Sequence, residues 1–109
     1  MTGDIIDVLT HVADEINSRL GRRVAEVKVN DKTGDVALIT QRSSSEVFVD
    51  KDEIRVMIWL PVSTIAPAIE VVKDGKGIKV IAFGKAYNVN AGGFIVTEVK
   101  ETAFVFLFR

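Results

Sequence analysis

The chain has 109 residues, of which 48% are hydrophobic and 27% are charged, a size and composition that fit one domain with its own core. Its net charge of −1 at pH 7 argues against a dedicated binder of nucleic acid or anionic membranes, because such proteins usually carry a clear positive excess. The absence of cysteine excludes disulfides, thiolate nucleophiles and cysteine-ligated metals.

The first residues, MTGDIIDVLTHVADEI, are acidic and amphipathic. They lack the basic region and the uninterrupted apolar core of a signal peptide. No apolar run in the chain approaches the roughly 20 residues that a membrane-spanning helix needs. We therefore expect a soluble, cytoplasmic protein.

A single amphipathic helix is predicted between Asp4 and Leu20. Its apolar residues recur at helical spacing and are Ile5, Ile6, Val8, Leu9, Val12, Ala13, Ile16 and Leu20. Asp4 is suited to the N-cap and Gly21 to the C-cap. Because the apolar stripe is wide, this helix is expected to cover another surface of the protein.

The rest of the chain reads as short strands separated by turns. The predicted strands span residues 24–29, 35–41, 47–49, 54–60, 69–72, 78–82, 85–89, 94–99 and 103–108. The turns between them are rich in glycine, asparagine and aspartate, as in Lys73–Gly77. This pattern predicts one mainly β domain over residues 1–109, with a helix at 1–21 and an antiparallel β-sandwich at 22–109.

Two strands alternate in a way that bears on function. Even positions from Ile54 to Leu60 are all apolar, whereas the odd positions include Met57 and Trp59. The last strand is apolar on both faces, with Phe104, Phe106 and Phe108 on one and Ala103, Val105 and Leu107 on the other. Apolar residues on both faces predict a strand covered on both sides. One face would meet the opposite sheet, and the other would receive the helix or a partner protein.

The order of elements from residue 46 to 109 resembles the alpha-crystallin domain of small heat-shock proteins. The matching segments are Val47–Val49, a charged turn, a strand that ends in Leu60-Pro61, Ile69-Glu70-Val71, a Lys-Asp-Gly turn, and Ile78–Ala82. Val62 stands where that family usually has glycine, and the segment from Ala82 to Phe94 is short for the loop that many members exchange between subunits. The resemblance therefore implies the compact, co-chaperone-type form, a mainly β protein-binding module without catalytic activity.

Two groups of residues could support metal or catalytic chemistry. His11 lies one helical turn from Asp7 and Glu15, and Asp50, Asp52 and Glu53 cluster in a turn. Both patterns are more typical of solvated charged surfaces, and neither has the ligand spacing of a calcium loop or the partners of a catalytic histidine. We predict no enzymatic activity, metal site or cofactor.

Apolar residues supply the predicted binding surface for polypeptide clients or a partner protein. This set comprises Met57, Trp59, Val62, Ile65, Phe104, Phe106 and Phe108. Two interpretations of Met57, Trp59 and the phenylalanine face remain open: core beneath the helix, or an exposed groove for clients or a second subunit. The function predicted is a chaperone-like or adaptor module.

Two alternative functions follow from other patterns. Phe83, Lys85, Tyr87 and Phe94 interleave aromatic and basic residues, as single-stranded nucleic-acid binders do. A structural subunit that assembles into a homodimer or larger homo-oligomer is the second alternative, because helix-first chains with apolar strands suit such a role.

Overall fold

A computed structural model describes residues 2–60, 67–100 and 102–109, without the side chains of residues 2–4. One helix and nine strands are present in this part of the chain. They are α1 (Thr2–Leu20), β1 (Ala25–Val29), β2 (Val36–Gln41), β3 (Ser44–Val49), β4 (Glu53–Trp59), β5 (Ile69–Asp74), β6 (Gly77–Ala82), β7 (Lys85–Val89), β8 (Phe94–Val99) and β9 (Ala103–Phe108).

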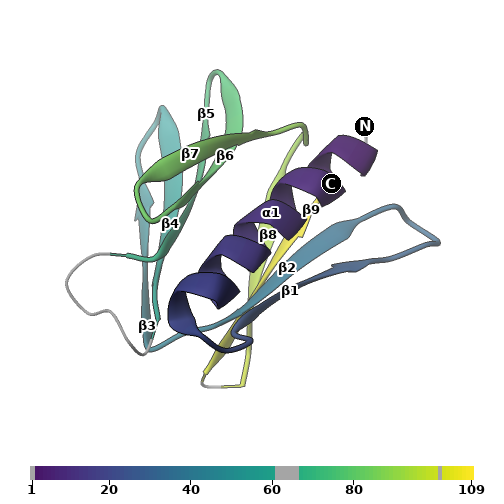
Figure 1. Ribbon diagram of the computed structural model, residues 1–109. Helices are drawn as coiled ribbons and strands as arrows, with labels where there is room; N and C mark the ends of the chain where they lie inside the picture. Colours follow the sequence, from purple (N-terminus) through teal and green to yellow (C-terminus); the bar gives the residue numbers. More distant parts are fainter. Residues whose placement is uncertain (1, 61–66, 101) are drawn as a thin grey trace.

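The strands form two antiparallel sheets (Figure 1). Sheet A has the order β1-β2-β9-β8, so that it joins strands from both ends of the chain. Sheet B is a meander in which β3, β4, β5, β6 and β7 follow one another. The predicted mainly β architecture with one N-terminal helix is therefore confirmed at this level.

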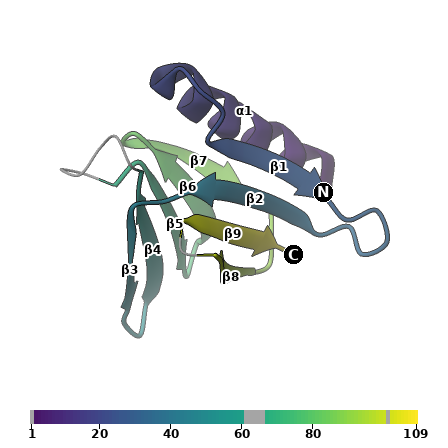
Figure 2. The ribbon, with the colours of Figure 1, turned by 90° about the horizontal axis from the view of Figure 1, so that it is seen from below.

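The chain passes between the sheets at two short connections, from β2 to β3 and from β7 to β8. The sheets stand at a steep angle to each other, as Figure 2 shows. Arg42 lies in the first connection, where its guanidinium carbon is 5.0 Å from the centre of the Phe104 ring. The same guanidinium forms an ion pair with Glu98 of β8. Arg42 thus closes one end of the space between the sheets.

Helix α1 packs along sheet A and against β7 of sheet B (Figures 1 and 2). Leu9, Val12 and Ile16 on one side of the helix have no exposed surface. They share a single core with inward-facing residues of both sheets, including Phe106 and Val80. The predicted apolar stripe therefore does cover a surface, and the side of each sheet that faces this core is called its inner face below.

One polar side chain fastens the helix to sheet A. The Asn17 side-chain oxygen accepts hydrogen bonds from the backbone N–H groups of Val24 and Ala25, at 2.7 and 2.9 Å. Its amide nitrogen donates to the carbonyl of Ala25 at 2.9 Å. These groups lie where the chain turns from the helix into β1, next to buried side chains. Asn17 therefore satisfies three backbone groups that this turn would otherwise leave without partners.

Several predicted boundaries differ from the observed ones. The helix begins at Thr2, so Asp4 lies inside the first turn and is not the N-cap. Gly21 has a φ of 67°, which agrees with the predicted C-cap. Strand β3 begins at Ser44, three residues before the predicted start at Val47.

The two alternating strands show which face is core. On β4, Val56 and Ile58 point to the inner face and are buried, whereas Met57 and Trp59 point to the outer face and are half-buried. Phe104, Phe106 and Phe108 of β9 belong to the core. The core interpretation is thus confirmed for the phenylalanines, which line no exposed groove. It is wrong for Met57 and Trp59, because the shared core lies on the opposite side of their strand, where Val56 and Ile58 are buried.

Candidate partner-binding surfaces

The most exposed apolar strand is β3, at the edge of sheet B. Within the described residues, β3 pairs with β4 alone. Three consecutive side chains in it are largely exposed: Val47 by 57%, Phe48 by 49% and Val49 by 65%. An edge strand also presents unpaired backbone N–H and C=O groups along its free side. This edge therefore offers both hydrogen-bonding groups and apolar surface.

Apolar side chains project from both faces of the β3–β4 hairpin. Val47 and Val49 stand on the inner face, where Val49 is opposite Ile54, which is 40% exposed. Phe48 stands on the outer face, opposite Arg55. Exposure of inner-face residues means that neither sheet A nor the helix extends over this hairpin. A partner that lies along β3 would therefore find apolar surface on either side of its backbone.

The charged turn between β3 and β4 is held by one carboxylate. Asp50 Oδ1 accepts hydrogen bonds from the backbone N–H of Asp52 at 2.7 Å and of Glu53 at 3.0 Å. A side chain that caps its own turn in this way stiffens the hairpin. No group of three possible metal ligands was found among the described residues, this turn and the helix included.

The outer face of sheet B carries an ion-pair network beside Met57 and Trp59. The Arg55 guanidinium contacts Glu53 at 3.2 Å and Glu70 at 2.7 Å. Hydrogen bonds to Glu53, which has the larger effect, and to Glu70 raise the pKa of Arg55 above its ordinary value. This face is therefore a mixed surface with ordered charges, unlike the apolar groove considered from the sequence.

The structure brings together three of the four residues predicted for nucleic-acid binding and places the fourth elsewhere. Phe83, Lys85 and Tyr87 lie beside helix α1, with the Arg19 guanidinium 4.6 Å from the Phe83 ring centre and the Lys85 amine 5.5 Å from that of Tyr87. Phe94 belongs to sheet A and packs against the ring of Phe108, at 6.0 Å between centres. The set thus forms no continuous platform on which bases could stack.

Tyr87 joins β7 to the helix through two polar contacts. Its hydroxyl donates a hydrogen bond to Glu15 at 2.8 Å and lies 3.3 Å from His11 Nε2. The hydrogen bond from Tyr87 lowers the pKa of Glu15, and the same bond raises the pKa of Tyr87. His11, considered from the sequence as a metal ligand, therefore lies in a contact between secondary-structure elements.

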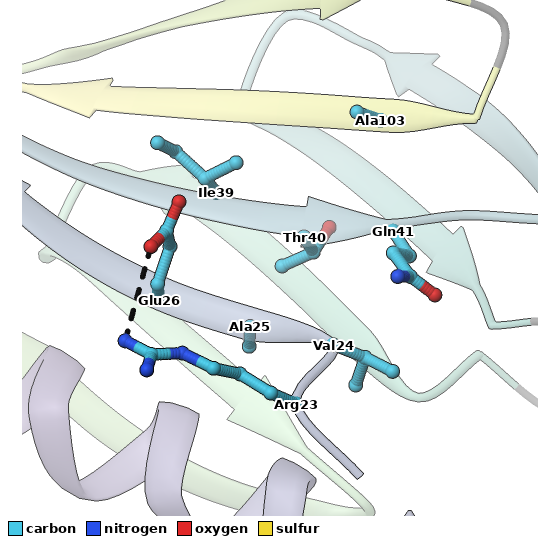
Figure 3. A pocket seen from close by; sticks show the side chains of 8 residues that line it. All are labelled: Arg23, Val24, Ala25, Glu26, Ile39, Thr40, Gln41 and Ala103. Atoms are coloured by element: carbon cyan, nitrogen blue, oxygen red, sulfur yellow. Dashed lines mark ion pairs between the residues drawn. The ribbon is translucent and has the colours of Figure 1, made fainter.

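Sheet A presents a second uncovered surface on the side away from the helix, called here the outer face of sheet A. It is formed by Glu26, Lys28, Ala37, Ile39, Gln41, Ile95, Thr97, Val99, Ala103, Val105 and Leu107. A hollow of about 240 Å³ lies at one end of it, bordered by Ile39, Gln41 and Ala103, and by Arg23, which pairs with Glu26 at 3.9 Å (Figure 3). The side of β9 that carries Ala103, Val105 and Leu107, opposite its phenylalanines, belongs to this face.

Val62 and Ile65, which complete the predicted partner-binding set, lie outside the described residues. Within the described part of the chain, no helix has the length and apolar character needed to cross a membrane. Comparisons with protein-family models, curated proteins and solved structures find no match for this chain. The geometry of the two uncovered surfaces is therefore what indicates a function.

Proposed function

We propose that this protein is a non-catalytic interaction module of the chaperone or adaptor type, which binds an extended polypeptide segment along β3. The observation that carries the proposal is the open edge of sheet B, with its consecutive exposed residues Val47, Phe48 and Val49. A segment that pairs with this edge would extend sheet B by one strand. Main-chain hydrogen bonds then supply affinity, and the alternating side chains supply specificity.

The composition of β3 defines the kind of segment that suits it. Removing the exposed apolar surface of Val47, Phe48 and Val49 from water would contribute roughly 1 kcal/mol per residue. Glu46 is the one charged residue of the strand and is itself exposed. The expected partner is therefore an extended, mainly apolar segment with a basic residue placed to meet Glu46.

The resemblance of residues 46–109 to alpha-crystallin domains supports this proposal. It implies an antiparallel two-layer domain that binds other polypeptides, and the compact form implied here has no separate catalytic site. We propose that the two sheets belong to this sandwich class. Strand β4, which precedes Leu60 and Pro61, and the β5–β6 hairpin correspond to the segments that carry the resemblance.

The proposal is tested by charging the edge. A Val47→Lys/Val49→Lys variant places two ammonium groups where the partner's apolar side chains would pack. Natural edge strands often carry lysine, which prevents pairing with another strand. A heat-denatured, aggregation-prone protein should stay in solution with the unaltered module and precipitate with the variant. The matched control is Ala86→Lys/Asn88→Lys, which adds the same charge to exposed residues of β7, the opposite edge strand.

Two results would contradict the proposal. If the unaltered module and the β3 variant keep the denatured protein in solution equally well, the binding surface is not β3. If the module neither prevents precipitation nor captures a polypeptide, the proposed function is wrong. A parallel titration with a single-stranded oligonucleotide distinguishes the alternative, since retention that weakens steeply with salt would favour nucleic-acid binding through the Arg19, Phe83 and Lys85 region.

A further inference from the structure

The outer face of sheet A is mostly apolar and has no cover among the described elements. Helix α1 and the shared core lie on the opposite side of the sheet. Ile95 and Val99 are 46% and 44% exposed, and Val105 and Leu107 in the middle of the face are half-buried by their neighbours alone. Exposed apolar patches that extend over a whole sheet commonly mark an interaction site.

We propose that a second copy of this chain covers the outer face of sheet A, so that two sheets stack face to face about a two-fold axis. Two adjacent rows of residues run across the four strands of this face. One row is Glu26, Ile39, Val105 and Thr97. The next row is Lys28, Ala37, Leu107 and Ile95.

A two-fold axis that runs between these rows, across the strands, places each row on the other row of the second copy. Ile39 then meets the small Ala37, and Val105 meets Leu107 at the centre. A two-fold interface uses the same patch on both subunits, so every contact occurs twice. The stacked sheets would therefore place a large residue on a small one at Ile39–Ala37 and two apolar residues on each other at Val105–Leu107.

The charges at the rim obey the same symmetry. Glu26 of one copy is placed over Lys28 of the other, and the reverse pair forms at the symmetric position. Within one chain these two side chains form an ion pair at 4.0 Å, and with 39% and 67% of their surface exposed both remain accessible to a second copy. Stacked sheets cross at about 30°, which shifts Glu26 of one copy sideways from Lys28 of the other at the edge of the interface. The long side chains of both residues are able to span this shift.

The size of the face indicates how tightly the copies bind. Four strands spaced by about 4.8 Å and about six residues long span roughly 19 by 20 Å. Side chains make the accessible area of each face larger than this flat area. The total area buried by two such faces therefore lies near the lower limit for specific interfaces. We therefore expect a dimer with a dissociation constant in the micromolar range. Strand β3 belongs to sheet B on the other side of sheet A, so the dimer would leave that edge open.

Sedimentation equilibrium between about 1 and 300 µM tests the inference, because the dissociation constant should fall within this range. The mass should rise with concentration from that of the 12.0 kDa chain to twice that value. Val105→Glu should keep the chain at its single mass throughout, because it places a carboxylate against Leu107 of the second copy. Circular dichroism of this variant is the control that checks that it is folded.

Rim charges provide a test that does not depend on the core of the patch. Glu26→Lys and Lys28→Glu, each alone, should weaken the dimer about tenfold, because each creates two like-charged contacts per dimer. Mixing these two variants should restore association, since every rim contact in the mixed dimer is then between opposite charges. The double variant Glu26→Lys/Lys28→Glu should also dimerise normally.

Three results would overturn the inference. They are a single mass at 300 µM, a dimer that persists in the Val105→Glu variant, and mixed rim variants that associate no better than each alone. A dimer that dissociates only in Val47→Lys/Val49→Lys would place the interface at β3. A β3 variant that loses client protection but keeps its dimer mass would support the binding edge and the dimer face as separate surfaces.

Discussion

Strands β3 and β9 both contain alternating valine and phenylalanine, but in opposite surroundings. Val47-Phe48-Val49 lies at the edge of sheet B and is largely exposed, whereas Phe104-Val105-Phe106 lies between two neighbours in sheet A and has its rings in the core. Valine and phenylalanine favour strands in both places. Position in the sheet, set by pairings elsewhere in the chain, therefore decides whether such a segment stabilises the fold or is available to a partner.

The largest expected effect is on stability, and it separates the two phenylalanines. Phe106→Ala should reduce the free energy of unfolding by about 3–5 kcal/mol, because it leaves a cavity at a position with no exposed surface. Phe48→Ala should change it by about 0.5 kcal/mol or less, as exposed substitutions usually do. Urea denaturation followed by tryptophan fluorescence measures both. Similar losses for the two variants would mean that β3 is covered in solution.

A smaller effect is expected where the helix joins sheet A. Asn17→Ala removes the partners of two backbone N–H groups and one carbonyl, and should reduce stability by about 2 kcal/mol. Ser18→Ala, on the exposed side of the same helical turn, is the control and should change stability little. Equal unfolding midpoints for the two variants would show that Asn17 does not fasten the helix.

A substitution in β2 should stabilise the fold. Thr40 is 1% exposed, and its hydroxyl has no hydrogen-bond partner among the described residues. Thr40→Val replaces this hydroxyl with a methyl group of similar shape and should raise stability by up to about 1 kcal/mol. Thr40→Ser keeps the hydroxyl and loses the methyl group, so it should lower stability. A destabilising Thr40→Val would indicate that the hydroxyl has a partner in solution.

The smallest effect concerns pH and the contact between helix and β7. The hydrogen bond from Tyr87 lowers the pKa of Glu15 from about 4.5, so its contribution is present above that value and is lost as the pH falls through the lowered pKa. The pKa of Tyr87 is raised, so its effect on stability has the opposite pH dependence. The stabilisation is present below about pH 10 and is lost only as the pH rises above that value.

Tyr87→Phe should therefore make the unfolding midpoint less sensitive to acid below about pH 4.5, because Glu15 returns toward its ordinary pKa. Thermal unfolding between pH 3 and pH 7 measures this difference, and NMR titration of the Glu15 carboxyl reports the pKa directly. An unchanged pKa of Glu15 in the variant would show that the hydrogen bond is absent in solution.

Local sequence patterns were sufficient to predict the order of the elements. The helix and all nine observed strands were expected in the right order, because helical and alternating spacing and turn residues are properties of short segments. Pairings between distant strands are not encoded in this way. Nothing in residues 36–41 indicates that β2 pairs with β9. The start of β3 was missed because its first residues, Ser44 and Ser45, are polar.

The candidate surfaces were harder to predict for the same reason. Alternation assigned Met57 and Trp59 to one face of β4, but only the position of the core between the sheets shows that this face is the outer one. Val47–Val49 was recognised as a strand without any sign that it lies at an edge. The outer face of sheet A needed the register of four strands, although the apolar residues on both sides of β9 already indicated that a second cover was required.

The pairing of β2 with β9 also imposes an order on folding. Every neighbouring pair in sheet B is formed by consecutive strands, so the meander closes only short loops. Sheet A must instead bring Gln41 to Ala103 across the intervening meander. Closure over longer loops is slower, and we expect pulsed hydrogen exchange to protect amides of β4–β6 before those of β2 and β9. Helix α1 packs mainly against β1, the strand that follows it in the chain, so its apolar side can gain most of its cover from the β1–β2 hairpin before β9 completes the sheet.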